Sequence, residues 1–217
     1  MLRSLVGSEM CIRDSIDYDL RNKMGEAAIK MASLLKYESA GTVEFLFDEK
    51  TKEFWFLEVN TRLQVEHPVT EEVTGIDLVR EQLKIANGDP LSISQDDVEI
   101  IGSSIEVRLY SEDPGNDFLP VTGKLIAFDP CEEPLVRWDV GVESGSEITP
   151  NFDPMLAKII SYGEDRIEAA NKLALALEKS HFGGLKTNRD YLIAILRSEE
   201  FLKGNTTTDF LLSLIHI

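Results

Sequence analysis

One short segment, Gly41–Pro68, constrains the fold of this chain more than any other. It reads GTVEFLFDEKTKEFWFLEVNTRLQVEHP. Its first half predicts a β-hairpin that turns at residues 49–52, because two runs of aromatic and β-branched residues flank a short polar run. We expect a register in which one face of the hairpin is apolar and belongs to the core. The expected pairs on that face are Val43 with Val59, Phe45 with Leu57, and Phe47 with Trp55.

The same register places Glu44 directly opposite Glu58 on the other face of the hairpin. Two like charges at facing positions destabilise a sheet unless a positive charge lies between them. Hard divalent cations accept carboxylate oxygens in this way, and Mg²⁺ commonly combines one or two carboxylates with substrate phosphates. The pair therefore predicts a metal site.

Polar residues continue at every second position after the hairpin, as Glu58, Asn60, Arg62, Gln64 and Glu66. If this stretch stays extended, all five side chains project to one side. An exposed strand face crossed by ion pairs is the plain alternative. Since Asn, Gln and Glu are poor strand formers, the row favours a functional site.

Two kinds of chemistry suit paired carboxylates. Hydrolysis of glycosides needs two acids that flank a bond, and it has no role for Asn60 or Arg62. A metal–phosphate site uses the whole row, with Glu44, Glu58 and Asn60 as oxygen ligands. Arg62 then binds an anion and Glu66 acts as a base.

His67 precedes Pro68 at the end of this segment, and a residue before proline favours extended backbone. We interpret this histidine as a packed or hydrogen-bonded spacer rather than a ligand.

The rest of the chain has an α+β pattern without repeats. Apolar spacing and end signals predict helices over residues 17–37, 77–86, 164–179 and 187–197. The first has the apolar stripe Leu20, Met24, Ala27, Met31, Leu34 and Leu35. Residues 98–109 predict a strand, and residues 112–154, rich in Gly and Pro, predict short strands and loops. The Gly183–Gly184 pair between the last two helices is interpreted as a turn, not as a phosphate loop.

Charge and composition exclude some functions. The chain has 217 residues and a formal net charge of −17, which argues against a nucleic-acid partner, since phosphate backbones need a basic face. No apolar run of about 18 residues is present, so we expect no membrane span. The two cysteines, Cys11 and Cys131, make no disulfide framework and favour a reducing compartment.

Both ends differ from the middle of the chain. Residues 1–15 (MLRSLVGSEMCIRDS) have neither a helical nor a strand period, and residues 212–217 (LSLIHI) are an apolar tail. We predict that residues 1–15 are an artefactual or disordered end and that residues 212–217 are an artefactual tail. No role is expected for Cys11 or His216.

The run FLEVNTRLQVEHPVTE at residues 56–71 resembles the signature of biotin carboxylases, which belong to the ATP-grasp superfamily. The resemblance extends over residues 16–210, with further matching pieces at 118–120 (FLP), 136–138 (VRW), 152–158 (FDPMLAK) and 186–188 (KTN). The second half is most similar to the biotin-carboxylase subunits of acyl-CoA carboxylases. The implied fold class is α+β, with the C-terminal half of an ATP-grasp domain at 16–97 and the biotin carboxylase C-terminal domain at 98–211.

The resemblance implies ATP- and bicarbonate-dependent carboxylation of biotin that is attached to a separate carrier domain. The implied cofactors are ATP, Mg²⁺ or Mn²⁺, and biotin. The implied partners are a biotin carboxyl carrier protein or domain, a carboxyltransferase subunit and a second copy in a homodimer, with neither nucleic acid nor membrane. The implied compartment is the cytoplasm, or the mitochondrial matrix in a eukaryote.

Position by position, the resemblance implies that Glu44 and Glu58 bind both ATP and Mg²⁺, and that Asn60 completes the metal site.

Four further positions match residues that bind bicarbonate or act in catalysis. Arg62 matches the catalytic arginine that binds bicarbonate, and Gln64 and the backbone of Val65 match the other bicarbonate contacts. Glu66 matches the base that deprotonates bicarbonate. Separately, Arg137 matches the arginine that contacts biotin, an assignment that rests wholly on the resemblance.

The chain lacks the family's glycine-rich flap, its upstream nucleotide-binding lysines and an Ala-Met-Lys-Met carrier sequence. We therefore expect a piece of a longer enzyme that is inactive alone. Two alternatives stay open at this point: another ATP-grasp carboxylate or amine ligase, and a non-catalytic assembly module.

Overall fold

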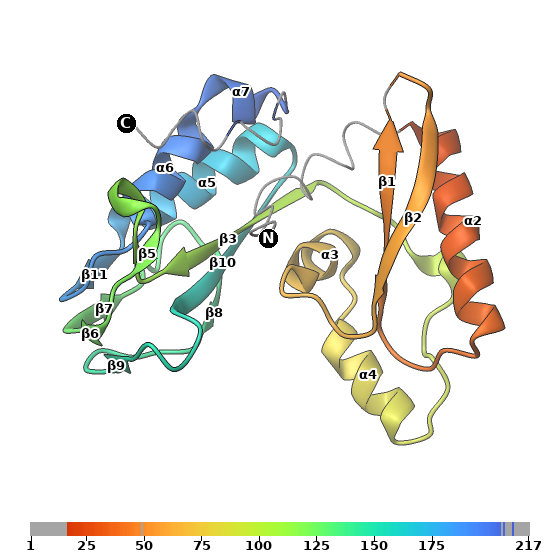
Figure 1. Ribbon diagram of the computed structural model, residues 1–217, viewed down its shortest axis with the longest axis horizontal. Helices are drawn as coiled ribbons and strands as arrows, with labels where there is room; N and C mark the ends of the chain where they lie inside the picture. Colours follow the sequence, from red (N-terminus) through yellow and green to blue (C-terminus); the bar gives the residue numbers. More distant parts are fainter. Residues whose placement is uncertain (1–16, 49, 205, 207–209, 211–217) are drawn as a thin grey trace. The chain divides into compact units, whose positions relative to one another are not determined.

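The computed structural model describes residues 17–48, 50–204, 206 and 210, in two compact units (Figure 1). The amino-terminal unit extends to Ile100 and the carboxy-terminal unit begins at Ile101. The two ends predicted to be artefactual lie outside the described residues, and the domain bounds 16–97 and 98–211 stay a prediction. Within the described part of the chain, no helix has the length and apolar character needed to cross a bilayer.

The amino-terminal unit begins with a long helix. Its elements are α2 (Tyr18–Leu34), β1 (Thr42–Asp48), β2 (Glu53–Asn60), α3 (His67–Thr74), α4 (Leu78–Ala86) and the short helix η1 (Gln95–Asp97). The carboxylate of Asp17 caps α2 by accepting the N–H of Leu20 at 2.8 Å. Of the predicted apolar stripe, Leu20 is buried and Met24, Ala27 and Met31 are half-buried, whereas Leu34 and Leu35 at the end of the helix are exposed.

The hairpin forms as predicted at its open end. β1 and β2 are antiparallel, and Val43 pairs with Val59 and Glu44 with Glu58. At the closed end the Asp48 carboxylate accepts the N–H of Lys50 at 2.7 Å, which stabilises the start of the turn. The sequence therefore placed the two carboxylates correctly.

Beyond Glu44 the predicted register is wrong. The pairing shifts by one residue, so that Phe45 pairs with Phe56 rather than with Leu57, and Leu57 is left without a partner in a β-bulge. A shift of one residue changes which side chains share a face. Trp55 and Leu57, which were predicted to lie in the core, are about half exposed, at 50% and 49%.

The extended polar row predicted after the hairpin is also wrong. β2 ends at Asn60, and α3 begins at His67, so His67 is helical rather than extended. Pro68 lies in the first turn of α3, where a missing N–H costs no hydrogen bond. Gly75 ends the helix in the left-handed conformation, at φ 70°.

Glu81 of α4 fixes the segment that follows this helix. Its carboxylate accepts hydrogen bonds from Lys84 Nζ at 2.7 Å, from Ser92 Oγ at 2.7 Å and from the Ser92 N–H at 3.2 Å. The hydrogen bond from Lys84 and those from Ser92 lower the pKa of Glu81 from 4.5 to about 2.

We predict that acid weakens this part of the unit. Because the pKa of Glu81 is lower in the folded state, its contribution is complete above the ordinary value of 4.5 and disappears as the pH falls towards about 2. Protection factors of the α4 amides, measured by hydrogen exchange, should fall across this range. Glu81→Gln should flatten the dependence, whereas Glu26→Gln, at an exposed position of α2, should behave as the wild type. An unchanged pH dependence in Glu81→Gln would contradict the prediction.

The carboxy-terminal unit contains many short strands and three helices within the described residues. Its elements are β3 (Ser103–Tyr110), β4 (Glu112–Asp113), η2 (Pro114–Asn116), β5 (Leu119–Pro120), β6 (Gly123–Lys124), β7 (Ala127–Asp129), β8 (Arg137–Val140), β9 (Glu147–Ile148), β10 (Met155–Gly163), α5 (Arg166–Lys179), β11 (His181–Gly183), α6 (Arg189–Arg197) and α7 (Glu199–Leu202). The prediction of a turn at Gly183–Gly184 is wrong for Gly183, which is the last residue of β11 and pairs with Ala127, and Gly184 follows the strand at φ 97°.

An antiparallel sheet in the order β3-β10-β8 forms the centre of this unit. Smaller antiparallel pairs are β4 with β5, β6 with β9, and β7 with β11. One face of the sheet packs on α5, and α6 packs on α5 in turn (Figure 1). Ile105 and Leu109 of β3, Ile159 of β10, and Leu173 and Leu177 of α5 are fully buried or nearly so and belong to one core. Alternation therefore places the apolar residues above on the face that packs on α5, while the opposite face combines charged side chains with the buried Ile160.

We predict that Leu173→Ala destabilises the carboxy-terminal unit by about 2–5 kcal/mol, since it deletes a side chain with no exposed surface and leaves a cavity. Leu175→Ala, on the same helix at 37% exposure, should change the free energy of unfolding by less than about 1 kcal/mol. Urea unfolding followed by circular dichroism measures both. Equal losses in the two variants would contradict this account of the core.

Candidate functional site

The facing pair of the hairpin is joined by a third predicted site residue. Asn60 Nδ2 donates a hydrogen bond to Glu44 Oε1 at 2.6 Å and another to Glu58 Oε1 at 3.2 Å. Glu44 and Glu58 face each other because their Cα positions are paired, and Asn60 shares the face with Glu58 two residues along β2. The positive end of the amide dipole thus lies where the charges of the two carboxylates require a positive partner.

These three residues fit a hard divalent cation. A half-turn of the Asn60 amide would exchange its NH₂ group for its carbonyl oxygen, so the three side chains can supply carboxylate and amide oxygens to one ion. Among the described residues, no group of three or more His, Cys, Asp or Glu side chains forms a metal cluster. The hairpin set therefore suits an ion that takes its remaining ligands from a bound substrate, as Mg²⁺ does with phosphates.

The next predicted residues lie in the loop between β2 and α3. Arg62 Nη1 donates to Gln64 Oε1 at 2.9 Å and to the carbonyl of Leu63 at 3.4 Å. The carbonyl of Gln64 contacts His67 Nδ1 at 2.8 Å and accepts the His67 N–H at 3.3 Å. His67 therefore acts locally as the predicted hydrogen-bonded spacer, and it holds the loop that carries Arg62 and Gln64.

Val65 and Glu66 follow in the turn that leads into α3. Glu66 is the residue before the first turn of this helix, and its carbonyl accepts the N–H of Val69 at 3.1 Å. The structure thus brings Glu44, Glu58 and Asn60 together and pairs Arg62 with Gln64. It does not bring Glu66 into one strand row with them.

Arg137 lies in the other unit, on β8. Its Nε donates to Asp139 Oδ1 at 2.8 Å and its Nη2 donates to Asp139 Oδ2 at 3.1 Å. Lys158 Nζ on β10 lies 3.2 Å from Asp139 Oδ2. Partial burial acts to raise the pKa of Asp139, but the hydrogen bonds from Arg137 and Lys158 outweigh it and hold the pKa below its usual value.

Sequence reasoning missed Asp139 and Lys158. A signal was available for Asp139, because an acid two residues after an arginine on a strand lies on the same face. No local signal existed for Lys158, which reaches Asp139 only through the pairing of β10 with β8.

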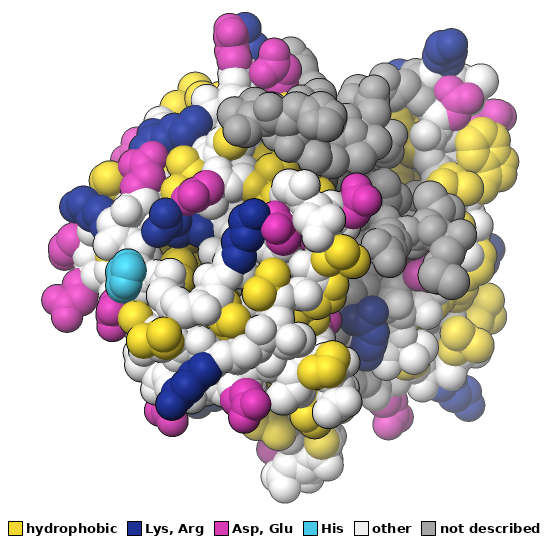
Figure 2. All heavy atoms as spheres, turned by 60° about the vertical axis from the view of Figure 1, so that its left-hand side comes forward, with side chains coloured by type: hydrophobic (Ala, Val, Ile, Leu, Met, Phe, Trp, Pro, Cys, Tyr) yellow, Lys and Arg dark blue, Asp and Glu magenta, His cyan; other side chains and the backbone are white. Residues whose placement is uncertain are grey.

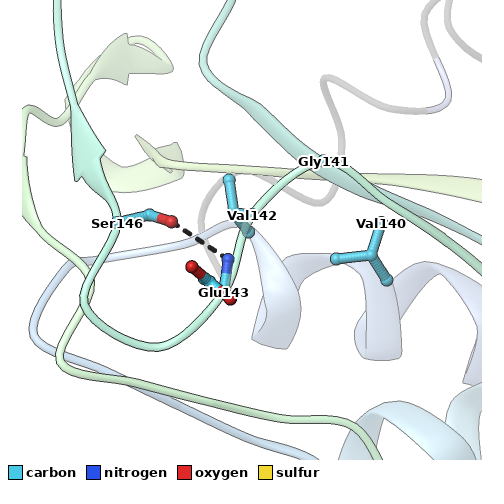
Figure 3. Close-up of a pocket in the computed structure, with 5 residues that line it drawn as sticks. All are labelled: Val140, Gly141, Val142, Glu143 and Ser146. Atoms are coloured by element: carbon cyan, nitrogen blue, oxygen red, sulfur yellow. Dashed lines mark hydrogen bonds between the residues drawn. The ribbon is translucent and has the colours of Figure 1, made fainter.

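An open pocket follows β8, lined by Val140, Gly141, Val142, Glu143 and Ser146 (Figure 3). Ser146 Oγ accepts the N–H of Glu143 at 3.0 Å and closes the loop. None of the predicted site residues lines this pocket, so it is not part of the candidate site.

The acidic charge of the chain is not uniform over its surface. On the face in Figure 2, dark blue Lys and Arg side chains alternate with magenta Asp and Glu.

Two family models together match almost all of the chain. Residues 106–213 match the family described as "Biotin carboxylase C-terminal domain". Residues 13–94, which include the hairpin, match the family described as "Carbamoyl-phosphate synthase L chain, ATP binding domain". The chain belongs to the biotin carboxylase family. Its fold class is α+β, with the C-terminal half of an ATP-grasp domain followed by the biotin carboxylase C-terminal domain, as predicted.

Curated relatives agree with this membership. The chain is 48% identical over 196 residues to "Biotin carboxylase 2" of Bacillus subtilis, covering 90% of this chain and 44% of that protein. It is 47% identical over 198 residues to "Propionyl-CoA carboxylase alpha chain, mitochondrial" of Homo sapiens, covering 90% and 27%. The chain thus spans less than half the length of these biotin carboxylase relatives.

Solved structures of biotin carboxylase domains have the same fold. "Biotin Carboxylase domain of Thermophilic 2-Oxoglutarate Carboxylase bound to Bicarbonate" superposes with a TM-score of 0.88 at 38% identity, covering 93% of this chain and 45% of that one.

Proposed function

We propose that this chain is part of a biotin carboxylase that carboxylates biotin on a carrier protein with ATP and bicarbonate, as the first half-reaction of an acyl-CoA or related carboxylase. The observation that supports it most directly is the amide of Asn60 bound to the facing carboxylates of Glu44 and Glu58. Two carboxylates and an amide are the oxygen ligands expected of a metal site under ATP phosphates, and this chain belongs to a family that uses ATP.

Each predicted site residue of the hairpin then has a role. Glu44 and Glu58 bind ATP through Mg²⁺ or Mn²⁺, and Asn60 completes the metal site. The metal, when bound, neutralises charge on the phosphates. Phosphoryl transfer depends mainly on positioning and charge neutralisation, and these side chains of the strand pair would position the ion that offsets the charge.

The loop residues act on bicarbonate. The guanidinium of Arg62, aligned by Gln64, binds the anion with Gln64 and the backbone of Val65, and Glu66 removes its proton. Support comes from the 2-oxoglutarate carboxylase domain, whose structure is described as bound to bicarbonate.

The remaining roles involve biotin and partner proteins. Arg137 contacts biotin. The partners we propose are a biotin carboxyl carrier domain, a carboxyltransferase subunit and a second copy in a homodimer. The propionyl-CoA carboxylase alpha chain among the relatives supports an acyl-CoA acceptor in the overall reaction.

The test uses a full-length enzyme in which residues 16–211 follow the amino-terminal portion of Bacillus subtilis biotin carboxylase 2, here named the restored enzyme. With Mg²⁺ it should cleave ATP in response to bicarbonate and should carboxylate free biotin. The 217-residue chain alone is the control and should do neither.

Other outcomes would contradict the proposal. A folded restored enzyme that binds ATP but ignores bicarbonate and biotin would indicate another ATP-grasp ligase. Bicarbonate-dependent ATP cleavage by the 217-residue chain alone would show that the chain needs no further segment.

A further inference from the structure

One face of the central sheet in the carboxy-terminal unit carries a row of charged side chains. β8 contributes Arg137 and Asp139, β10 contributes Lys158, and β3 contributes Glu106 and Arg108. Lys158 is paired in register with Asp139 on one side and with Arg108 on the other. Three cations and two anions leave a net positive charge here, in a strongly acidic chain.

Asp139 holds the guanidinium of Arg137 at two points. Its two oxygens accept from Nε and Nη2, at 2.8 and 3.1 Å, and a two-point contact of this kind fixes the plane of an arginine as a single contact does not. Nε and Nη2 form one edge of the guanidinium, so the edge that carries Nη1 is directed away from Asp139.

Lys158 in turn holds Asp139. Its side chain is only 13% exposed, and its Nζ lies 3.2 Å from Asp139 Oδ2. An exposed Arg–Asp pair contributes little by itself, because water competes for both partners. With Lys158 on the adjacent strand, Asp139 cannot turn away without losing contacts to two cations.

We infer that Asp139, supported by Lys158, is a positioning residue that aligns Arg137 for biotin. This inference rests on the proposed contact between Arg137 and biotin. Arg137, Asp139 and Lys158 together keep one net positive charge, so Arg137 is aligned by an acid and still attracts an oxygen on which negative charge develops.

The first experiment uses the 217-residue chain and does not depend on activity. In chain labelled with ¹⁵N-arginine, the Nε–H resonance of Arg137, identified by its loss in Arg137→Lys, should exchange slowly with water. Asp139→Asn should shift this resonance and speed its exchange. Asp190→Asn removes the acid of another Arg–Asp pair, with Arg189 on α6, and should leave the Arg137 resonance unchanged.

The second experiment measures kinetics in the restored enzyme. Asp139→Asn should raise KM for free biotin about tenfold, the effect of losing charge-assisted hydrogen bonds, while biotin-independent ATP cleavage stays within about twofold. Asp139→Glu should recover part of the loss, and Lys158→Met should give a smaller rise. Asp190→Asn is again the control.

A double variant separates positioning from an independent effect. If Asp139 acts through Arg137, then Asp139→Asn should add nothing to Arg137→Ala. Additive losses, or an unchanged Nε–H resonance in Asp139→Asn, would overturn the inference. If Arg137→Ala impairs biotin carboxylation and Asp139→Asn does not, the inference alone fails. If Arg137→Ala has no effect on biotin, the proposed role of Arg137 fails as well.

Discussion

Glu58→Gln in the restored enzyme should lower kcat for Mg²⁺-dependent ATP cleavage at least about 100-fold, with or without biotin. Glu58 faces Glu44 across the hairpin. The uncharged amide that replaces its carboxylate in the variant would leave one carboxylate and Asn60 to hold the ion. Part of the activity should return at high Mg²⁺ or Mn²⁺ concentration, because the weakened site then fills by mass action. Initial rates over a metal titration measure both effects.

The matched control is Glu53→Gln, an exposed acid at the start of β2. It removes the same charge from the same strand and should leave the metal dependence unchanged. Equal metal titration curves for Glu58→Gln and the wild type would exclude Glu58 as a ligand, whatever the activity of the restored enzyme.

Arg62→Ala should remove the response of ATP cleavage to bicarbonate, with a loss of about 100- to 1000-fold in kcat/KM for bicarbonate. The Arg62 guanidinium is the cation of the loop between β2 and α3, and Gln64 aligns it by accepting a hydrogen bond from Nη1 at Oε1, at 2.9 Å. Binding of ATP should change little, because the metal ligands of the hairpin stay in place. Rates at varied bicarbonate, together with calorimetric titration of ATP, separate the two effects.

Two further variants sharpen this test. Arg62→Lys keeps the charge but loses the planar, two-point geometry, so it should recover only a small part of the activity. Arg80→Ala removes an exposed arginine of α4 and should be silent. A full bicarbonate response in Arg62→Ala would move the anion site away from this loop.

Local patterns were enough to predict the features that depend on neighbours in sequence. The helices predicted over residues 17–37 and 77–86 form as α2 and α4, where Asp17 and Asp77 are the caps because a carboxylate before a helix can reach an N–H in the first turn. Glu44 and Glu58 face each other because side chains alternate along paired strands and a short turn joins them. The matched signature at residues 56–71 also indicated the family that the comparisons confirm.

The predictions from local pattern were wrong where strand pairing and packing decide the structure. The bulge at Leu57 shifts the register of the hairpin, and β2 ends at Asn60, so Arg62 lies in a loop that leads to α3. Nothing in the alternation of residues marks an unpaired position, since it depends on how both strands fit their surroundings.

Sequence by itself determined that two carboxylates face each other on the hairpin, with an amide two residues along the second strand. Tertiary structure alone decided which residues distant in sequence meet. Asp139 meets Lys158 only because β8 and β10 pair in one register, whereas its contact with Arg137 follows from alternation along β8 itself. Short-range order follows from alternation and capping, whereas contacts between distant strands follow from the packing of the whole sheet.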